Sequence, residues 1–217
     1  MTFGGVLFEI GGIGITNNML IMSAITVFLT VLSYLATRNI REKPRGLQNV
    51  MEAVLEALQN FLGGMLDSDS TARRFLPFLA SLFLFILICN YVGIPHFPGV
   101  YSPTATLSVT AGLALVSFIA VQFYGFKVHK LSYLKRFFSP LIILLLLEEF
   151  IFPFSLSLRL FGNIFGKSQV AGAVASLIPL LASLPIMVLG MLLGAVQALV
   201  FTLLTSIFIA KATVDEH

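Results

Sequence analysis

Five long apolar runs dominate the pattern of hydrophobic and polar positions along the chain. They cover approximately residues 19–36, 75–94, 105–126, 138–165 and 174–210. A helix needs about 20 mostly apolar residues to cross a bilayer, so each run predicts a transmembrane helix. The last two runs exceed a perpendicular crossing, which predicts long, tilted helices, with Pro179 and Pro185 as bend points in the last. The pattern predicts an all-α integral membrane protein with about five spans in a single membrane domain, residues 1–217.

A sixth helical pattern, over residues 46–64, is amphipathic. Its apolar residues recur at helical spacing: Leu47, Val50, Met51, Val54, Leu55, Leu58, Phe61 and Leu62. Glu52 and Glu56 interrupt the opposite face. Such a segment is typical of a helix that lies in the membrane interface, and the alternative is packing on a partner subunit. The short Gly11–Gly14 stretch lacks the context of a nucleotide-binding turn, so we expect a loop there.

Composition indicates that lipid is the main solvent of these runs. Hydrophobic residues make up 58% of the chain and charged residues 11%. Soluble domains are about half apolar and about a quarter charged, so this chain has too few charges to cover a water-facing surface. No basic stretch is interleaved with aromatic residues, which argues against a nucleic-acid partner.

Lysine and arginine gather in the loops on one side of the predicted spans. They follow the first, third and fifth spans or precede the second: Arg38, Arg41, Lys43, Arg45, Arg73, Arg74, Lys127, Lys130, Lys135, Arg136 and Lys211. Lys167 is the exception on the other side. Because cytoplasmic loops carry an excess of basic residues, five spans place the N-terminus outside and the C-terminus in the cytoplasm.

Arg159 is the anomaly of the fourth run, because residues 153–164 contain no other formal charge. Ionisable residues at membrane depth are costly and usually face a water-filled cavity or an ion path. Arginine keeps its charge on burial, where lysine can lose it. The residue therefore indicates a fixed positive charge on a cation path. The alternative is a structural arginine paired with a carboxylate or with backbone carbonyls.

Polar neighbours extend Arg159 into a stripe. Asn163 follows it by four residues and Ser155 precedes it by four, so all three share one helical face. Glu148 lies eleven residues before Arg159, nearly three turns away and ~16 Å along the axis, with Glu149 ~100° further around. The stripe predicts an aqueous access path that ends at a charge barrier. The alternative is that both glutamates only anchor the helix near the interface.

Gln197 is the corresponding polar residue of the fifth run. Gly190, Gly194 and Ala198 repeat at four-residue spacing beside it, a small-residue strip that permits close helix approach. Together with Arg159, Gln197 predicts a polar pocket near the membrane middle. The single cysteine and the three isolated histidines form no recognisable metal-binding or catalytic arrangement, so we expect no cofactor and no self-contained enzyme.

Three motifs carry a resemblance to a known family. Residues 157–164 read SLRLFGNI, preceded by Glu148-Glu149-Phe150 and followed by Gln197-Ala198-Leu199-Val200-Phe201-Thr202. This pattern resembles subunit a of the rotary F-type ATP synthase, and the LRLFGN run is highly specific to that family. Pro103-Thr104-Ala105 is similar to another family element. The likeness extends over most of the chain and is strongest after residue 140.

The resemblance implies a non-catalytic stator subunit in the bacterial inner (plasma) membrane. It would belong to a hetero-oligomeric complex with a ring of c subunits, peripheral-stalk b subunits and lipid as partners. Two half-channels would reach an ion-binding carboxylate on each c subunit from opposite sides, with Arg159 between them. The resemblance puts Asn163 and Gln197 beside that path, and Glu148 and Glu149 on the cytoplasmic access side.

The sequence departs from the family pattern in the outer half-channel. Ser168 stands where many members have an acid, Gly190 where many have His or Glu, and Thr106 where a further acid is usual. Ser168, Gln169 and Thr106 are then the expected polar contacts of that half-channel. The coupling ion is expected to be H+, with Na+ as the alternative because it needs oxygen ligands and no titrating relay.

Two other functions compete with the stator. One is a stand-alone secondary transporter or channel, which would usually show an internal repeat that this sequence lacks. The other is a structural assembly subunit in which Arg159 is an internal strut. The c-ring size and the direction of ATP turnover leave no trace in this chain, because both depend on other subunits.

Overall fold

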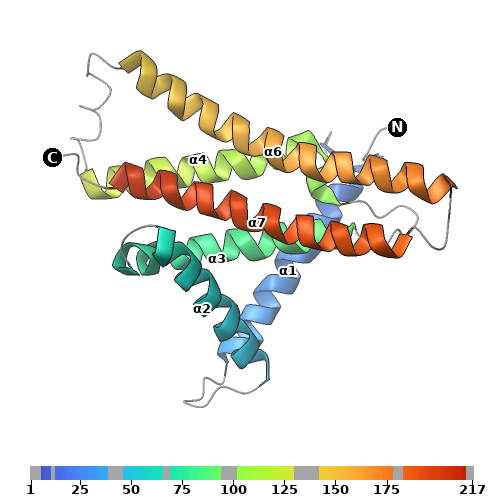
Figure 1. Cartoon of the computed structure of the whole chain (residues 1–217), viewed down its shortest axis with the longest axis horizontal. Coiled ribbons are helices and arrows are strands. Elements are labelled where there is room, and N and C mark those ends of the chain that lie inside the picture. The colour runs from blue at the N-terminus through green and yellow to red at the C-terminus, as the bar shows by residue number, and fades with distance from the viewer. Residues whose placement is uncertain are drawn as a thin grey trace. The chain divides into compact units, whose positions relative to one another are not determined.

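The computed structural model describes residues 6–10, 13–38, 46–65, 69–93, 102–129, 142–177 and 183–213 (Figure 1). The chain divides into two compact units, residues 1–103 and 104–217. Apart from a short hairpin at its start, the described chain is helical. The fold is that of an all-α integral membrane protein.

Unit 1 opens with a two-stranded antiparallel hairpin, β1 (Val6–Ile10) and β2 (Ile13–Thr16). The hydrophobic pattern did not predict it. The expectation of a loop over Gly11–Gly14 is wrong for its second half, because Ile13 and Gly14 pair with β1. A period-2 signal needs several alternating residues, and strands this short among glycines provide too few.

The first three helices of unit 1 are α1 (Asn17–Thr37), α2 (Leu47–Met65) and α3 (Asp69–Val92). Helix α2 is the predicted amphipathic helix. It packs on both α1 and α3, and its buried side chains Leu58 and Leu62 belong to the core of the unit. Its own chain therefore covers part of the apolar face that was assigned to the membrane interface or to a partner.

Helix α1 has the surface of a lipid-facing span. Of its described side chains only Asn18 and Ile25 are buried, while Val27 is 62% and Phe28 55% exposed. A water-facing helix would not present such residues on most of its circumference, whereas lipid accepts them.

A close backbone approach ties the end of α3 to the segment before unit 2. Ser102 Oγ donates a hydrogen bond of 2.8 Å to the carbonyl oxygen of Cys89. A Cβ added to Gly93 would lie 2.5 Å from the Ser102 amide nitrogen. Position 93 therefore requires glycine, because any side chain would push the two segments apart.

Unit 2 is a three-helix assembly of α4 (Leu107–His129), α6 (Ile142–Leu177) and α7 (Ser183–Thr213), which run side by side in Figure 1. A 3-10 turn, η1 (Pro103–Ala105), precedes α4. Each of the three helices packs on the other two. Thr110 of α4 hydrogen-bonds Ser157 of α6 at 3.2 Å, and the rings of Phe152 (α6) and Phe208 (α7) stack at 3.8 Å.

The predicted boundary between the fourth and fifth runs is misplaced. Helix α6 continues to Leu177 instead of ending at residue 165, so residues 174–177 belong to it and not to the fifth span. The polar Lys167-Ser168-Gln169 triplet suggested an interface, but polar side chains alone do not end a helix. Pro179 lies outside the described residues. Pro185 is in the first turn of α7, where proline is tolerated, and so is no bend point.

Four described helices are long and apolar enough to cross a membrane: residues 17–37, 74–92, 107–128 and 187–213. They match the first, second, third and fifth predicted runs. Helix α6 is 36 residues long, which also suffices to span, but it carries two glutamates, an arginine and a lysine. It is therefore the helix in which polar chemistry is concentrated.

Candidate functional site

A groove between α6 and α7 holds the polar stripe of the fourth run. Its volume is about 510 Å³, and its lining residues are Leu147, Glu148, Ile151, Phe152, Ser155, Leu156, Arg159, Leu204 and Phe208. The polar members are all on α6, spaced seven and four residues apart. The helical spacing thus brings Glu148, Ser155 and Arg159 onto one groove, with an otherwise apolar wall.

Arg159 lies on the outward face of α6. The next residue, Leu160, is completely buried in unit 2, as is Leu156 to within 1%. Arg159 itself is exposed. Within the described residues no hydrogen bond or ion pair joins its guanidinium to another side chain. This geometry leaves the charge available to something outside the unit and does not resemble an internal strut.

Asn163 and Gln197 are joined to each other across the helices. Asn163 Nδ2 donates a hydrogen bond to Gln197 Oε1. Gln197 is only 3% exposed, and its Nε2 has no acceptor in the described part of the chain. Buried Gly194 is one turn before Gln197 on α7. Glycine has no side chain to hold neighbouring helices apart, so this position permits close packing beside the amide pair.

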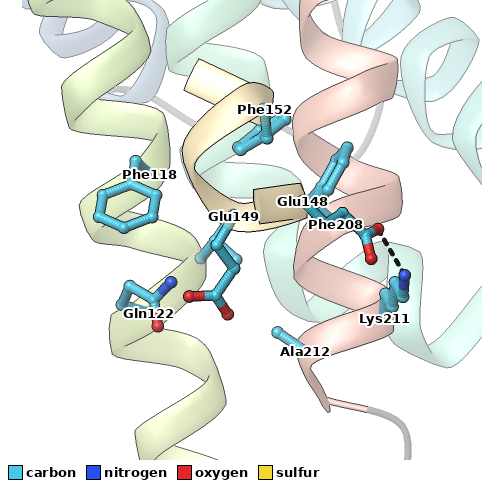
Figure 2. Close-up of a pocket in the computed structure, with 9 residues that line it drawn as sticks. Phe118, Gln122, Glu148, Glu149, Phe152, Phe208, Lys211 and Ala212 are labelled. Atoms are coloured by element: carbon cyan, nitrogen blue, oxygen red, sulfur yellow. Dashed lines mark hydrogen bonds and ion pairs between the residues drawn. The ribbon is translucent and has the colours of Figure 1, made fainter. Parts of the chain in front are cut away.

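The two adjacent glutamates point to different helices (Figure 2). Glu148 forms an ion pair with Lys211 of α7. Glu149 extends instead toward Gln122 of α4, beside a small cavity of about 20 Å³ that both residues line. A cavity of that size has room for about one water molecule. The ~100° between consecutive helical residues explains the split.

Lys211 and Gln122 were not among the predicted site residues. Lys211 had been used only to orient the helices, although its position near the end of the fifth run puts it level with the start of the fourth. Gln122 was an available signal, since it is the one amide of the third apolar run, residues 105–126. Neither pairing follows from the sequence without knowing which helix faces which.

The residues expected in the outer half-channel are not gathered on this groove. Ser168 Oγ bonds the Phe165 carbonyl of its own helix, and Gln169 is exposed. Thr106 stands before α4, where its carbonyl accepts from the amides of Val109 and Thr110. Lys167, which was expected in a loop on the outer side, lies within α6 and donates a hydrogen bond to the Gly190 carbonyl of α7.

A multi-span helical membrane protein with an unpaired arginine on a groove is the class that this fold and site define. Comparison with known proteins assigns the chain to one family within this class. The family profile of the ATP synthase A chain matches residues 19–210. The chain belongs to this family, which confirms the resemblance carried by the LRLFGN run.

Curated relatives agree along nearly the whole chain. ATP synthase subunit a of Moorella thermoacetica is 41% identical over 209 residues, covering 94% of this chain and 94% of that protein. ATP synthase subunit a of Trichlorobacter lovleyi is 40% identical over 200 residues, covering 89% and 85%. ATP synthase subunit a 1 of Pelobacter propionicus is 37% identical over 216 residues, covering 96% and 91%.

Proposed function

We propose that this chain is the ion-translocating stator subunit of an F-type ATP synthase, working beside a ring of c subunits in the plasma membrane. The family assignment supports the membership in the membrane sector. The single observation that carries the mechanism is the exposed, unpaired Arg159 at the end of the α6–α7 groove. A fixed charge on an outward face is suited to a partner that passes by.

Arg159 acts on the carboxylate of each passing c subunit. Its guanidinium favours the ionised carboxylate and so promotes release of the bound ion. The same charge prevents the ion from moving directly to the other side, so net transport requires rotation of the ring. One charge crossing about 100 mV releases about 2.3 kcal/mol, so several ions must cross for each ATP, which a ring with many sites provides.

The groove is the inner access path. It leads from Glu148 past Ser155 to Arg159, and the helix positions put the two ends ~16 Å apart. Glu149 and Gln122, with the small cavity that they line, lie beside the Glu148 end of the groove. The two carboxylates of Glu148 and Glu149 outnumber the one ammonium of Lys211 at this end, so its net charge is negative and attracts cations. The apolar wall of the groove keeps that attraction weakly screened.

Asn163 and Gln197 form the polar contact beyond Arg159, toward the outer half-channel. Their amides offer oxygen and N–H groups without a net charge, which suits the passage of water and protons. Ser168, Gln169 and Thr106 complete the outer path in this proposal. The coupling ion is H+, and Na+ is the alternative.

The loop charges support an orientation of the chain in the membrane, and its exposed apolar side chains indicate the remaining partners. The excess of basic residues in alternate loops supports an orientation with the N-terminus outside and the C-terminus in the cytoplasm. Exposed apolar side chains on α4 and α7, such as Ile119 (57%) and Leu192 (61%), face lipid, c subunits or the b subunits of the peripheral stalk. The chain carries out no chemistry on ATP itself.

ATP synthesis by the whole complex in proteoliposomes tests this function, with Arg159→Ala compared with wild type. We expect an assembled complex without synthesis. A strut would instead lose assembly, and a stand-alone transporter would move ions in vesicles that contain this chain but no c-ring. Normal synthesis by Arg159→Ala would contradict the proposed function.

A further inference from the structure

Lys211 joins the last turn of α7 to the Glu148 end of the groove (Figure 2). Its Nζ donates a hydrogen bond to Glu148 Oε1, and the two side chains are 44% and 39% exposed. Water reaches both charges, so the ion pair adds little to the stability of the helix pair. What the contact changes most is the charge at this end of the groove.

Glu148 belongs to two spaces at once. It lines the groove that leads to Arg159. It also lines the small cavity of about 20 Å³, together with Glu149, Gln122 and Lys211. No other charged residue among the described ones lines both the groove and this cavity. An ion that leaves the groove at this end therefore passes the Glu148 carboxylate.

The charged residues that line the cavity sum to one net negative charge. Glu148 and Glu149 contribute two negative charges, and Lys211 contributes one positive charge. Arg159, the other charge on the groove, lies ~16 Å away along α6. Without Lys211 the Glu148 end would carry two negative charges and would bind any cation more strongly.

The other titratable groups near this end are on α4. Tyr124 and Lys127 belong to its last two turns, and His129 is its last residue. None of the three is among the residues that line the cavity or the groove. Within the described chain, Lys211 is thus the one cation that lines the cavity with the two glutamates.

We infer that Lys211 prevents the translocated ion from being held at the inner end of the path, because its ammonium cancels the charge of Glu148. The inference rests on the proposed function, in which the ion leaves by this end during ATP synthesis. One net negative charge still attracts cations, but it retains them less strongly than two would. Lys211 exchanges no proton itself and acts through Glu148, as a positioning residue.

The direction of ion flow separates this role from a structural one. In ATP synthesis the ion leaves by the Glu148 end, whereas in ATP-driven pumping it enters there. Additional negative charge at that end slows release of a cation and favours its capture. Loss of the Lys211 charge should therefore slow synthesis and leave pumping at the wild-type rate or above it. A mere clasp between α6 and α7 would affect both directions alike.

Lys211→Gln in the whole complex is the test, because glutamine keeps an N–H donor for Glu148 but lacks the charge. In proteoliposomes at low ionic strength we expect ATP synthesis to fall about two- to fivefold, the effect expected from a partly exposed ion pair. Salt added on the side where ATP is made should reduce the loss, because it screens exposed charges. Lys211→Arg keeps the charge and should keep the wild-type rate.

Lys127→Gln is the matched control. It removes a positive charge from the exposed C-terminal end of α4, at a residue that lines neither the cavity nor the groove. Its rates of synthesis and pumping should both equal those of wild type. If Lys211→Gln does not assemble, Lys211→Met, which keeps most of the side-chain length without the charge, is measured in the same way.

Equal losses of synthesis and pumping in Lys211→Gln would overturn the inference and leave only the clasp. Unchanged synthesis in that variant would also overturn it, as would a loss of the same size in Lys211→Arg. Arg159→Ala, measured in parallel, keeps the two levels apart. Persisting synthesis in that variant contradicts the proposed function, whereas every outcome for Lys211 leaves the proposed function standing.

Discussion

The hydrogen bond between Asn163 and Gln197 allows a sharp prediction about what holds α6 against α7. Asn163 donates to Gln197 Oε1, while Gln197 Nε2 is buried without an acceptor among the described residues. Asn163→Ala would leave both polar atoms of a 3% exposed amide without a partner. Asn163→Ala should therefore destabilise the helix pair, although position 163 itself is exposed.

The magnitude follows from the cost of an unsatisfied buried group. Leaving such a group unpaired costs about 1–3 kcal/mol. Hydrogen bonds between helices in membranes average about 0.6 and reach about 1.7 kcal/mol, because the separated helices also find partners. For Asn163→Ala we expect a loss of about 1–2 kcal/mol. Gln197→Leu in the same chain removes the stranded amide, so the double variant should recover most of that loss.

The assay is the thermal dissociation of the purified complex, followed by release of this subunit, for wild type, both single variants and the double variant. The predicted order places Asn163→Ala below the double variant in stability. The argument fails if Asn163→Ala is as stable as wild type. It also fails if adding Gln197→Leu lowers the stability of Asn163→Ala further.

Two other predictions concern packing. Gly93→Ala should sharply reduce the amount of subunit found in membranes by immunoblot, because its Cβ would lie 2.5 Å from the Ser102 amide nitrogen. The control Gly112→Ala, whose Cβ would have nothing within 4 Å, should leave that amount unchanged. Equal amounts of the two variants would show that the approach of Ser102 to Gly93 is not tight. Leu160→Ala removes a side chain that is 0% exposed and should lower the stability measured by thermal dissociation by about 2–5 kcal/mol. The control Leu158→Ala, at a side chain that is 42% exposed, should lower it far less. Similar losses of stability would mean that the buried and exposed faces of α6 are wrongly assigned.

Much of the fold was predictable because lipid imposes a simple rule on the sequence. Every backbone polar group in the bilayer core must be paired within the protein, so a long apolar run is a helix. The first three spans therefore lie close to their predicted bounds. The amphipathic helix was also recognisable, since α2 begins at Leu47 and ends at Met65 against a prediction of residues 46–64.

The boundary between the last two helices was not predictable from hydrophobicity. Lys167 and its polar neighbours were interpreted as the end of the fourth span at the membrane interface, yet α6 continues through them to Leu177. A charged residue ends an apolar run without ending a helix. Pro179 was the better signal, because α6 ends at Leu177, two residues before it, and a residue that precedes proline is disfavoured in a helix.

The candidate site also has a part that was predictable from the sequence and a part that was not. Helical periodicity sufficed to place Glu148, Ser155 and Arg159 on one face, because those residues share one helix. Contacts between helices required the structure. The ion pair of Glu148 with Lys211, the Asn163–Gln197 hydrogen bond and the Lys167–Gly190 contact all depend on register and rotation between α6 and α7, which no single-helix pattern contains.

The measurement that tests the central claim most directly follows ATP synthesis and passive ion leak in the same proteoliposomes, for wild type and Arg159→Ala, at one imposed driving force. If Arg159 is the fixed charge that couples ion flow to rotation, the variant complex assembles and synthesises no ATP, whether or not ions leak. Synthesis at the wild-type rate by an assembled Arg159→Ala complex would contradict the account.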